Sequence, residues 1–294
     1  MIFQNQNVLE LKSGSSRALI DPQGGRLLLW EVHGRQVIYW PEQANWSQPL
    51  KIRGGNPILF PFVARHMVDG KIGFWKDQTG VVREMPMHGF GRNCLYHAEI
   101  KENTCTLTLT DSESTHAFYP YSFNFQITYT LGPKSLDTQL TTKNLSTTSL
   151  PYYAGHHFYF ALPHQDRAAW EFAVDSTQQV RQNSDGSIFP QSRSSKPFRL
   201  SDPEFIDSLH ILSGQGPVLL RNPNTGQSLA IHLNWPETVP WFSVTSWTEK
   251  SDSDFYCLEP WLGLPNAIHH GRGLRHLPPG EQETARCLID LGKW

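Results

Sequence analysis

Apolar and polar residues alternate along most of this chain, as they do in strands that bury one face. Residues 122–131, Ser-Phe-Asn-Phe-Gln-Ile-Thr-Tyr-Thr-Leu, show the longest such run. A Gly-Pro-Lys turn at 132–134 then predicts a hairpin whose second strand covers 136–142. Similar short runs, bounded by turn residues, predict further strands at 17–20, 26–32, 105–110, 218–221, 228–233, 240–247 and 284–291.

Helical patterns are scarce. Residues 201–205, Ser-Asp-Pro-Glu-Phe, predict one short helix, because Ser or Asp followed by Pro is typical of a helix N-terminus. No Ser/Gly linker, charge block or internal repeat divides the chain. We therefore expect 1–294 to form a single all-β domain of packed antiparallel sheets. Long loops are expected at 41–92 and 176–216, where binding residues would gather.

The charge balance favours a small molecule as the binding partner. The chain has 25 Lys and Arg against 27 Asp and Glu, which gives a formal net charge of −2. It therefore lacks the positive excess that attracts nucleic acid or a membrane surface. Aromatic residues make up 12% of the chain and include ten Trp. They fit a β-rich core, and such rings also stack on the apolar faces of sugars.

The cysteines and the N-terminus predict a cytoplasmic protein with reduced thiols. The four cysteines, at 94, 105, 257 and 287, form no C-x-x-C pair, so neither a zinc knuckle nor a redox motif is expected. The first residues have no basic segment followed by a long apolar stretch, which argues against a signal peptide. No uninterrupted apolar run is long enough to span a bilayer.

Glu259 is the strongest single candidate for chemistry. It follows the strand-like run 254–258 and precedes Pro260 and Trp261. A carboxylate at a strand end among apolar residues is expected to face a partly desolvated cleft, which favours its neutral form and suits a base near pH 7. The alternative is a Glu at the rim of the sheet that is bonded to backbone.

Three upstream segments carry His and Arg side chains that could complete a site. Arg53 precedes two glycines, and His88 and Arg92 bracket a Gly-Phe-Gly turn. The alternative for each is a solvated turn. His156 and His157 are adjacent, so on a strand they point to opposite faces and only one would face a given cleft. That spacing argues against a metal site. No phosphate-binding loop, dinucleotide fingerprint or serine-hydrolase elbow is present.

Together, in this order, the segments resemble the galactose mutarotase-like (aldose 1-epimerase) family, and most closely its hexose-6-phosphate mutarotase branch. The resemblance covers roughly the whole chain, and it implies a large antiparallel β-supersandwich. The phrases that carry it are Asp21-Pro22-Gln23-Gly24-Gly25-Arg26-Leu27, Arg53-Gly54-Gly55-Asn56-Pro57 with Phe60-Pro61, His88-Gly89-Phe90-Gly91-Arg92, Tyr119-Pro120-Tyr121-Ser122-Phe123, Gly155-His156-His157-Phe158-Tyr159-Phe160, Leu258-Glu259-Pro260-Trp261 and Pro278-Pro279-Gly280-Glu281.

The resemblance implies roles for three residues. The family's G-x-H-x-Y-F phrase selects His157 rather than His156 as the catalytic acid, its glutamate base matches Glu259, and the histidine of its turn matches His88. In the implied reaction the base and the acid act on opposite sides of the anomeric carbon and open the sugar ring. The open aldehyde then rotates and closes again as the other anomer. This chemistry implies neither a metal nor a cofactor.

The resemblance also implies residues that bind the substrate. Arg53 and Arg92 match positions that face the sugar, and Asp207 is the candidate for a family aspartate that holds hydroxyls, with Asp202 as its rival. His156 departs from the family pattern, which usually has an apolar residue there. The segment 65–83 is longer than in the pattern. Both departures leave the choice of sugar or sugar phosphate open.

The implied function is that of an isomerase acting on a hexose or a hexose 6-phosphate. As partners we expect a small-molecule sugar or sugar phosphate, no nucleic acid and no membrane, with the protein a monomer or a weak dimer. The main alternative is a carbohydrate-binding or sensor protein without catalysis on the same fold. A glycoside hydrolase is disfavoured, because hydrolysis ordinarily needs two carboxylates and only one is well placed.

Overall fold

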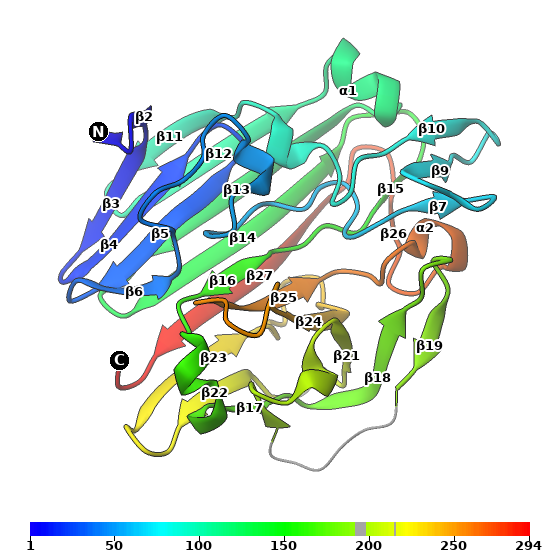
Figure 1. Cartoon of the computed structure of the whole chain (residues 1–294). Helices are drawn as coiled ribbons and strands as arrows, with labels where there is room; N and C mark the ends of the chain where they lie inside the picture. Colours follow the sequence, from blue (N-terminus) through cyan, green and yellow to red (C-terminus); the bar gives the residue numbers. More distant parts are fainter. Residues whose placement is uncertain (192–197, 215) are drawn as a thin grey trace.

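Two large antiparallel sheets dominate the computed structural model, which describes residues 1–191, 198–214 and 216–294 (Figure 1). Within these residues, the first sheet has nine strands, in the order β11 (His97–Lys101), β12 (Thr104–Thr110), β13 (Phe123–Leu131), β14 (Ser135–Asn144), β27 (Gln282–Leu291), β23 (Gln227–His232), β22 (Val218–Asn222), β17 (Glu171–Ala173) and β20 (Phe198–Arg199). The second has ten, in the order β19 (Ile188–Pro190), β18 (Ser176–Gln182), β21 (Ser208–Leu212), β24 (Ser243–Trp247), β25 (Tyr256–Trp261), β16 (Phe158–Phe160), β6 (Arg35–Ile38), β5 (Arg26–Val32), β4 (Ser16–Asp21) and β3 (Leu9–Ser13).

The sheets pack against each other through one apolar core. In Figure 1 the blue strands β3 to β5 lie in front of the cyan and green strands β12 to β14. Ile127 and Leu140 of the nine-stranded sheet belong to the same buried cluster as Ile20 and Phe158 of the ten-stranded sheet. The all-β supersandwich predicted from the sequence is therefore confirmed.

Smaller elements complete the described part of the chain. Short strand pairs join β1 (Ile2–Phe3) to β2 (Gln6–Asn7), β7 (Met67–Val68) to β8 (Lys71–Ile72), β9 (Phe74–Lys76) to β10 (Val82–Glu84), and β15 (Leu150–Tyr152) to β26 (Arg275–Leu277). The helices are α1 (Glu113–Phe118) and α2 (Ala267–His270), with 3₁₀ turns at Pro49–Lys51, Gly91–Asn93, His164–Ala169 and Pro203–Phe205. No helix among the described residues is long and apolar enough to cross a membrane.

Every strand that alternation predicted is present in the structure. The prediction of two long loops is wrong, because both segments contain strands. The segment 41–92 holds the hairpins β7–β8 and β9–β10, and the segment 176–216 supplies β18 to β21. Strand β18, Ser-Thr-Gln-Gln-Val-Arg-Gln, has too few apolar residues to show alternation, and β21 is buried on both faces. Residues 192–197 and 215 of the second predicted loop lie outside the described residues. The short helix predicted at 201–205 is present as the turn Pro203–Phe205.

Strands β24, β25 and β16 are neighbours in the ten-stranded sheet, and their register lines up one face of side chains. Thr245 lies opposite Glu259, while Trp247 and Tyr159 both lie opposite Cys257. Residues directly opposite in antiparallel strands place their side chains on the same face. The intervening residues turn the other way, into the core between the sheets. The sheet thus carries one face of mixed polar and aromatic side chains opposite the face that packs between the sheets.

Candidate active site

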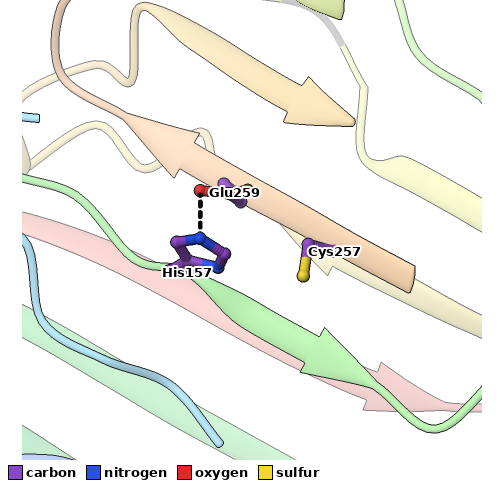
Figure 2. Close-up of side chains that lie close together, drawn as sticks. All are labelled: His157, Cys257 and Glu259. Carbon is purple, nitrogen blue, oxygen red and sulfur yellow. Dashed lines mark ion pairs between the residues drawn. The ribbon is translucent and has the colours of Figure 1, made fainter. Parts of the chain in front are cut away.

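His157 and Glu259 meet on that face of the sheet. The imidazole Nε2 of His157 lies 3.4 Å from Oε2 of Glu259 (Figure 2). Glu259 sits inside β25 rather than at a strand end, and it is only 2% exposed. The expected strand-end position is therefore wrong, and so is the alternative of a Glu on the rim. The register of β16 against β25 brings together two side chains that are distant in sequence.

Burial acts on the two partners in opposite directions. It raises the pKa of the Glu259 carboxyl well above its usual range, and the negative charge of Asp207 adds to that rise. It lowers the pKa of the His157 imidazole well below its usual range, and the nearby charges of Arg92, Arg26 and Arg53 lower it further. Burial therefore favours the state in which the pair shares one proton, with the carboxyl protonated and the imidazole neutral. That proton can lie on either group without changing the net charge of the pair.

His88 is held beside His157 as a hydrogen-bond donor. Its Nδ1 accepts a hydrogen bond from the backbone N–H of Ala64 at 3.1 Å, so its proton must be on Nε2. The two imidazole rings lie 5.5 Å apart. His88 adopts a left-handed backbone with φ of 67°, and Gly89 follows because a Cβ there would overlap the backbone of Phe60. Burial lowers the pKa of His88, which keeps it neutral.

Arg53 lies at the edge of the site but is already paired. Its Nη2 is 2.8 Å from Oε1 of Glu249, and its guanidinium lies 5.6 Å above the ring of Trp247. It lines a cavity of about 500 Å³ together with Glu249 and Phe255. Arg53 therefore combines stacking on an aromatic side chain with a neutralised charge.

Arg92 lies in a more positive setting. It lines a cavity of about 370 Å³ together with Arg26 and Asp21, and its Nη2 donates to the backbone carbonyl of Met87 at 2.8 Å. Arg26 was not predicted as a site residue. It is 9% exposed and donates to three backbone carbonyls of the segment 49–54. Neither this cavity nor that of Arg53 is lined by His157 or Glu259.

Of the two candidate aspartates, Asp207 is the better placed. Its charge is close enough to raise the pKa of Glu259. It has a left-handed backbone with φ of 59°, which is uncommon outside glycine and clusters at functional positions. Asp202 instead accepts a hydrogen bond from the backbone N–H of Arg199 at 3.0 Å, within its own turn.

Sequence reasoning predicted His157 and Glu259 but missed Thr245 and Trp261, whose polar groups also lie at the site. Among the described residues, Nδ1 of His157 and Oγ1 of Thr245 are buried and make no hydrogen bond, whereas Glu259 contacts Nε2 of His157 at 3.4 Å and also interacts with the side chain of Trp261. Buried polar atoms are normally satisfied, so a cluster of unsatisfied ones indicates a place where a ligand completes the bonding. The two-residue period of strands was the available signal, because it places Trp261 and Glu259 on the same face.

One group of side chains has the donor types that zinc takes. Single ligand atoms of His157, Cys257 and Glu259 lie within 4.8 Å of one another, and all three side chains are buried (Figure 2). Burial raises the pKa of the Cys257 thiol well above its usual range, so the sulfur is protonated near neutral pH. A metal here would have to displace the thiol proton of Cys257 and the proton that His157 and Glu259 share. The reaction proposed below needs no such ion.

Comparison with known proteins places the chain among sugar-modifying enzymes. The family model described as aldose 1-epimerase matches residues 7–290. Protein LacX of Lactococcus lactis is 25% identical over 97% of this chain and 96% of its own length. A crystal structure from Synechocystis has a TM-score of 0.84 at 21% identity and covers 100% of this chain and 99% of that one.

A second solved structure is described as a galactose mutarotase related enzyme from Lactobacillus acidophilus. It has a TM-score of 0.81 at 22% identity and covers 98% of both chains. At these identities the two structures bear on the fold, whereas the family match extends over nearly all residues. The chain belongs to the aldose 1-epimerase family.

Proposed function

We propose that this protein is an aldose 1-epimerase that interconverts the α and β anomers of a hexose by opening and closing the sugar ring. The observation that carries this proposal is the contact between His157 and Glu259, at 3.4 Å on one face of a sheet. A proton donor and a proton acceptor in contact, holding one proton between them, are what ring opening requires.

The proposed step balances within the pair. With Glu259 as carboxylate and His157 as imidazolium, Glu259 takes the proton of the C1 hydroxyl. The O–H electrons form the C1=O double bond, the C1–O5 bond breaks, and O5 takes the proton from His157. The pair is then neutral, which is the state that burial favours for both groups. After rotation about C1–C2, the reverse transfers close the ring on the other face of the aldehyde.

The short distance between His157 and Glu259 suits a substrate whose two reacting oxygens, the C1 hydroxyl and O5, are bonded to the same carbon. The resemblance implied an acid and a base on opposite sides of the anomeric carbon, whereas the two groups lie 3.4 Å apart. The C1 hydroxyl oxygen and O5 are both bonded to C1, so neighbouring groups can reach both. His88, with its proton on Nε2, would donate to an oxygen that gains negative charge as the ring opens.

We further propose that the protein accepts hexose 6-phosphates. Arg92 and Arg26 line one cavity, where Asp21 is the single carboxylate among the described lining residues, whereas Glu249 already neutralises Arg53. A phosphate is therefore expected on the Arg92 side rather than the Arg53 side. This prediction departs from the sequence expectation, in which both arginines had equal claims.

The test is a polarimetric panel with freshly dissolved glucose, galactose and their 6-phosphates. An epimerase accelerates the approach of at least one sugar to its anomeric equilibrium, and a preference for phosphate appears as a higher kcat/KM for the 6-phosphates. If no sugar in the panel is accelerated while calorimetry still detects binding, the protein is a carbohydrate-binding or sensor protein and the epimerase proposal is wrong.

A further inference from the structure

We propose that His156 is a positioning residue. Held as a neutral imidazole with its proton on Nε2, it fixes the backbone of His157 through Asn56. The proposal rests on the proposed function in one respect only, namely that His157 acts on the sugar. The hydrogen-bond directions follow from the geometry of the network and do not depend on catalysis.

A chain of buried contacts runs from the core to His157. The side-chain Oδ1 of Asn56 accepts the backbone N–H of His157 at 2.8 Å, and its Nδ2 lies 3.0 Å from Nδ1 of His156. On the other side of the ring, Nε2 of His156 lies 3.1 Å from Oγ1 of Thr138. That hydroxyl is also 3.1 Å from the carbonyl oxygen of Cys287, so the chain ends on the backbone of β27.

The direction of every bond follows from the His157 end. A backbone N–H can only donate, so the atom of Asn56 that faces His157 must be its oxygen. The amide NH₂ of Asn56 then faces His156, and because it can only donate, Nδ1 of His156 must be unprotonated. A neutral imidazole with a free Nδ1 carries its proton on Nε2.

The Thr138 end of the hydrogen-bond network independently gives the same tautomer for His156. The carbonyl oxygen of Cys287 can only accept, so the single hydroxyl proton of Thr138 is used there. The hydroxyl oxygen is then free to accept from His156, whose Nε2 must therefore be N–H. The second N–H of the Asn56 amide points to the hydroxyl of Tyr129 at 3.5 Å, and Tyr129 donates onward to the carbonyl of Gly25.

Every alternative arrangement brings two donors face to face. A proton on Nδ1 of His156 would oppose the NH₂ of Asn56, and turning that amide over would oppose its NH₂ to the N–H of His157. An imidazolium also carries a proton on Nδ1, which would oppose the NH₂ of Asn56. Burial also lowers the pKa of His156 to about 3, which agrees with a ring that stays neutral.

The network ties the reactive residue to the opposite sheet. His156 and His157 lie just before β16, outside the regular ladder of hydrogen bonds. Thr138 lies on β14, so the contact between His156 and Thr138 links that segment to the nine-stranded sheet. Stacking on Phe158 at 4.7 Å between ring centres holds the imidazole plane. His156 thus joins the core to the backbone that carries His157.

The tautomer is tested directly by long-range ¹H–¹⁵N correlation spectra of the histidine rings, with His156→Gln used to assign its signals. We expect the Nε2–H form of His156, unchanged between pH 5 and pH 8. An Nδ1–H form, or a protonated ring within that range, overturns the proposal. This measurement involves no turnover, so its outcome is separate from the question of catalysis.

The effect on catalysis is tested at Thr138, the end of the hydrogen-bond network that is farthest from His157. Thr138→Val removes the acceptor for the Nε2–H of His156, whereas Thr138→Ser keeps it. We expect the Val variant to lose about tenfold in kcat with KM unchanged, less than the roughly 100-fold that a misplacement of 1 Å can cause. The Ser variant should stay within about twofold of the parent.

A purely structural role would lower the melting temperature of the Val variant but leave the kcat of the folded protein unchanged, and that result overturns the proposal. An equal loss of kcat in both variants also overturns it, because the hydroxyl would then not be the cause. If Thr138→Val does not fold, Asn56→Asp replaces it. A carboxylate can accept from His157 but cannot donate to Nδ1, so His156 should change to the Nδ1–H or charged form in that variant.

Discussion

The adjacent histidines 156 and 157 are both buried, yet they differ in whether their polar atoms have partners. Both ring nitrogens of His156 face hydrogen-bond partners, Asn56 on one side and Thr138 on the other. Nδ1 of His157 has none among the described residues, and its Nε2 faces the carboxylate of Glu259 at 3.4 Å. Satisfied buried groups stabilise a single arrangement, whereas unsatisfied ones cost free energy until something binds to them. His156 therefore belongs to the structural core, whereas its neighbour His157 belongs to the candidate active site.

The charges around the two rings differ as well. Burial alone lowers the pKa of His156. At His157, the charges of Arg92, Arg26 and Arg53 add to burial, and Glu259 lies in contact. Substitution of a charged neighbour should therefore alter His157 and leave His156 unchanged.

Glu259→Gln should abolish most of the activity. The amide keeps the size of the side chain but cannot take the proton of the C1 hydroxyl, so kcat is expected to fall by about 10²–10⁴-fold. Sugar affinity measured by calorimetry should change little. The matched control is Glu99→Gln, at an exposed position on β11, which should keep parental rates. If the Glu259→Gln variant turned over at close to the parental rate, Glu259 would have no part in the mechanism.

Much of the fold could be predicted from the sequence, because alternation in β12, β13 and β14 reflects one buried face. Strands β18 and β21 were missed because β18 has few apolar residues and β21 is buried on both faces, so neither shows alternation. Helix α1 was missed because its N-terminal signal is a local capping box at Ser112 and Thr115 rather than an apolar period.

For the site, the sequence supplied the candidates but not their contacts. Glu259 was a candidate from its strand context and His157 was selected through the resemblance, while their contact depends on strand pairing between segments far apart in the chain. The partnership of His156 with Asn56 and Thr138 depends on the same long-range packing. Periodicity cannot report such contacts, because it describes a strand and not its neighbours.

The same Glu259→Gln protein should be the more stable form at alkaline pH. The pKa of Glu259 is raised in the folded state, so its contribution to stability is fully present below the unfolded value of 4.5. That contribution is lost as pH rises through the folded pKa, by about 1.4 kcal/mol for each unit of elevation. The amide has no such dependence. Urea unfolding should therefore show that the free energy of unfolding of the variant, relative to the parent, is higher at pH 8 than at pH 5. An equal change with pH in both proteins would contradict a buried, protonated carboxyl.

With an unphosphorylated hexose as substrate, Arg92→Gln should produce the smallest change, a shift of the acid limb of the activity profile. Activity needs one proton on the pair, so it falls at low pH when His157 gains a second. Because the pKa of His157 is lowered, this limb should lie below the ordinary value of 6.5. Arg92 contributes to that lowering through its positive charge, so its removal should raise the pKa and move the limb to higher pH. The profile of kcat against pH measures the shift, while the ring signals of His156 should stay unchanged. A limb that stays in place would show that burial alone sets the protonation of His157, and a shift of both histidines would contradict the difference in their surroundings.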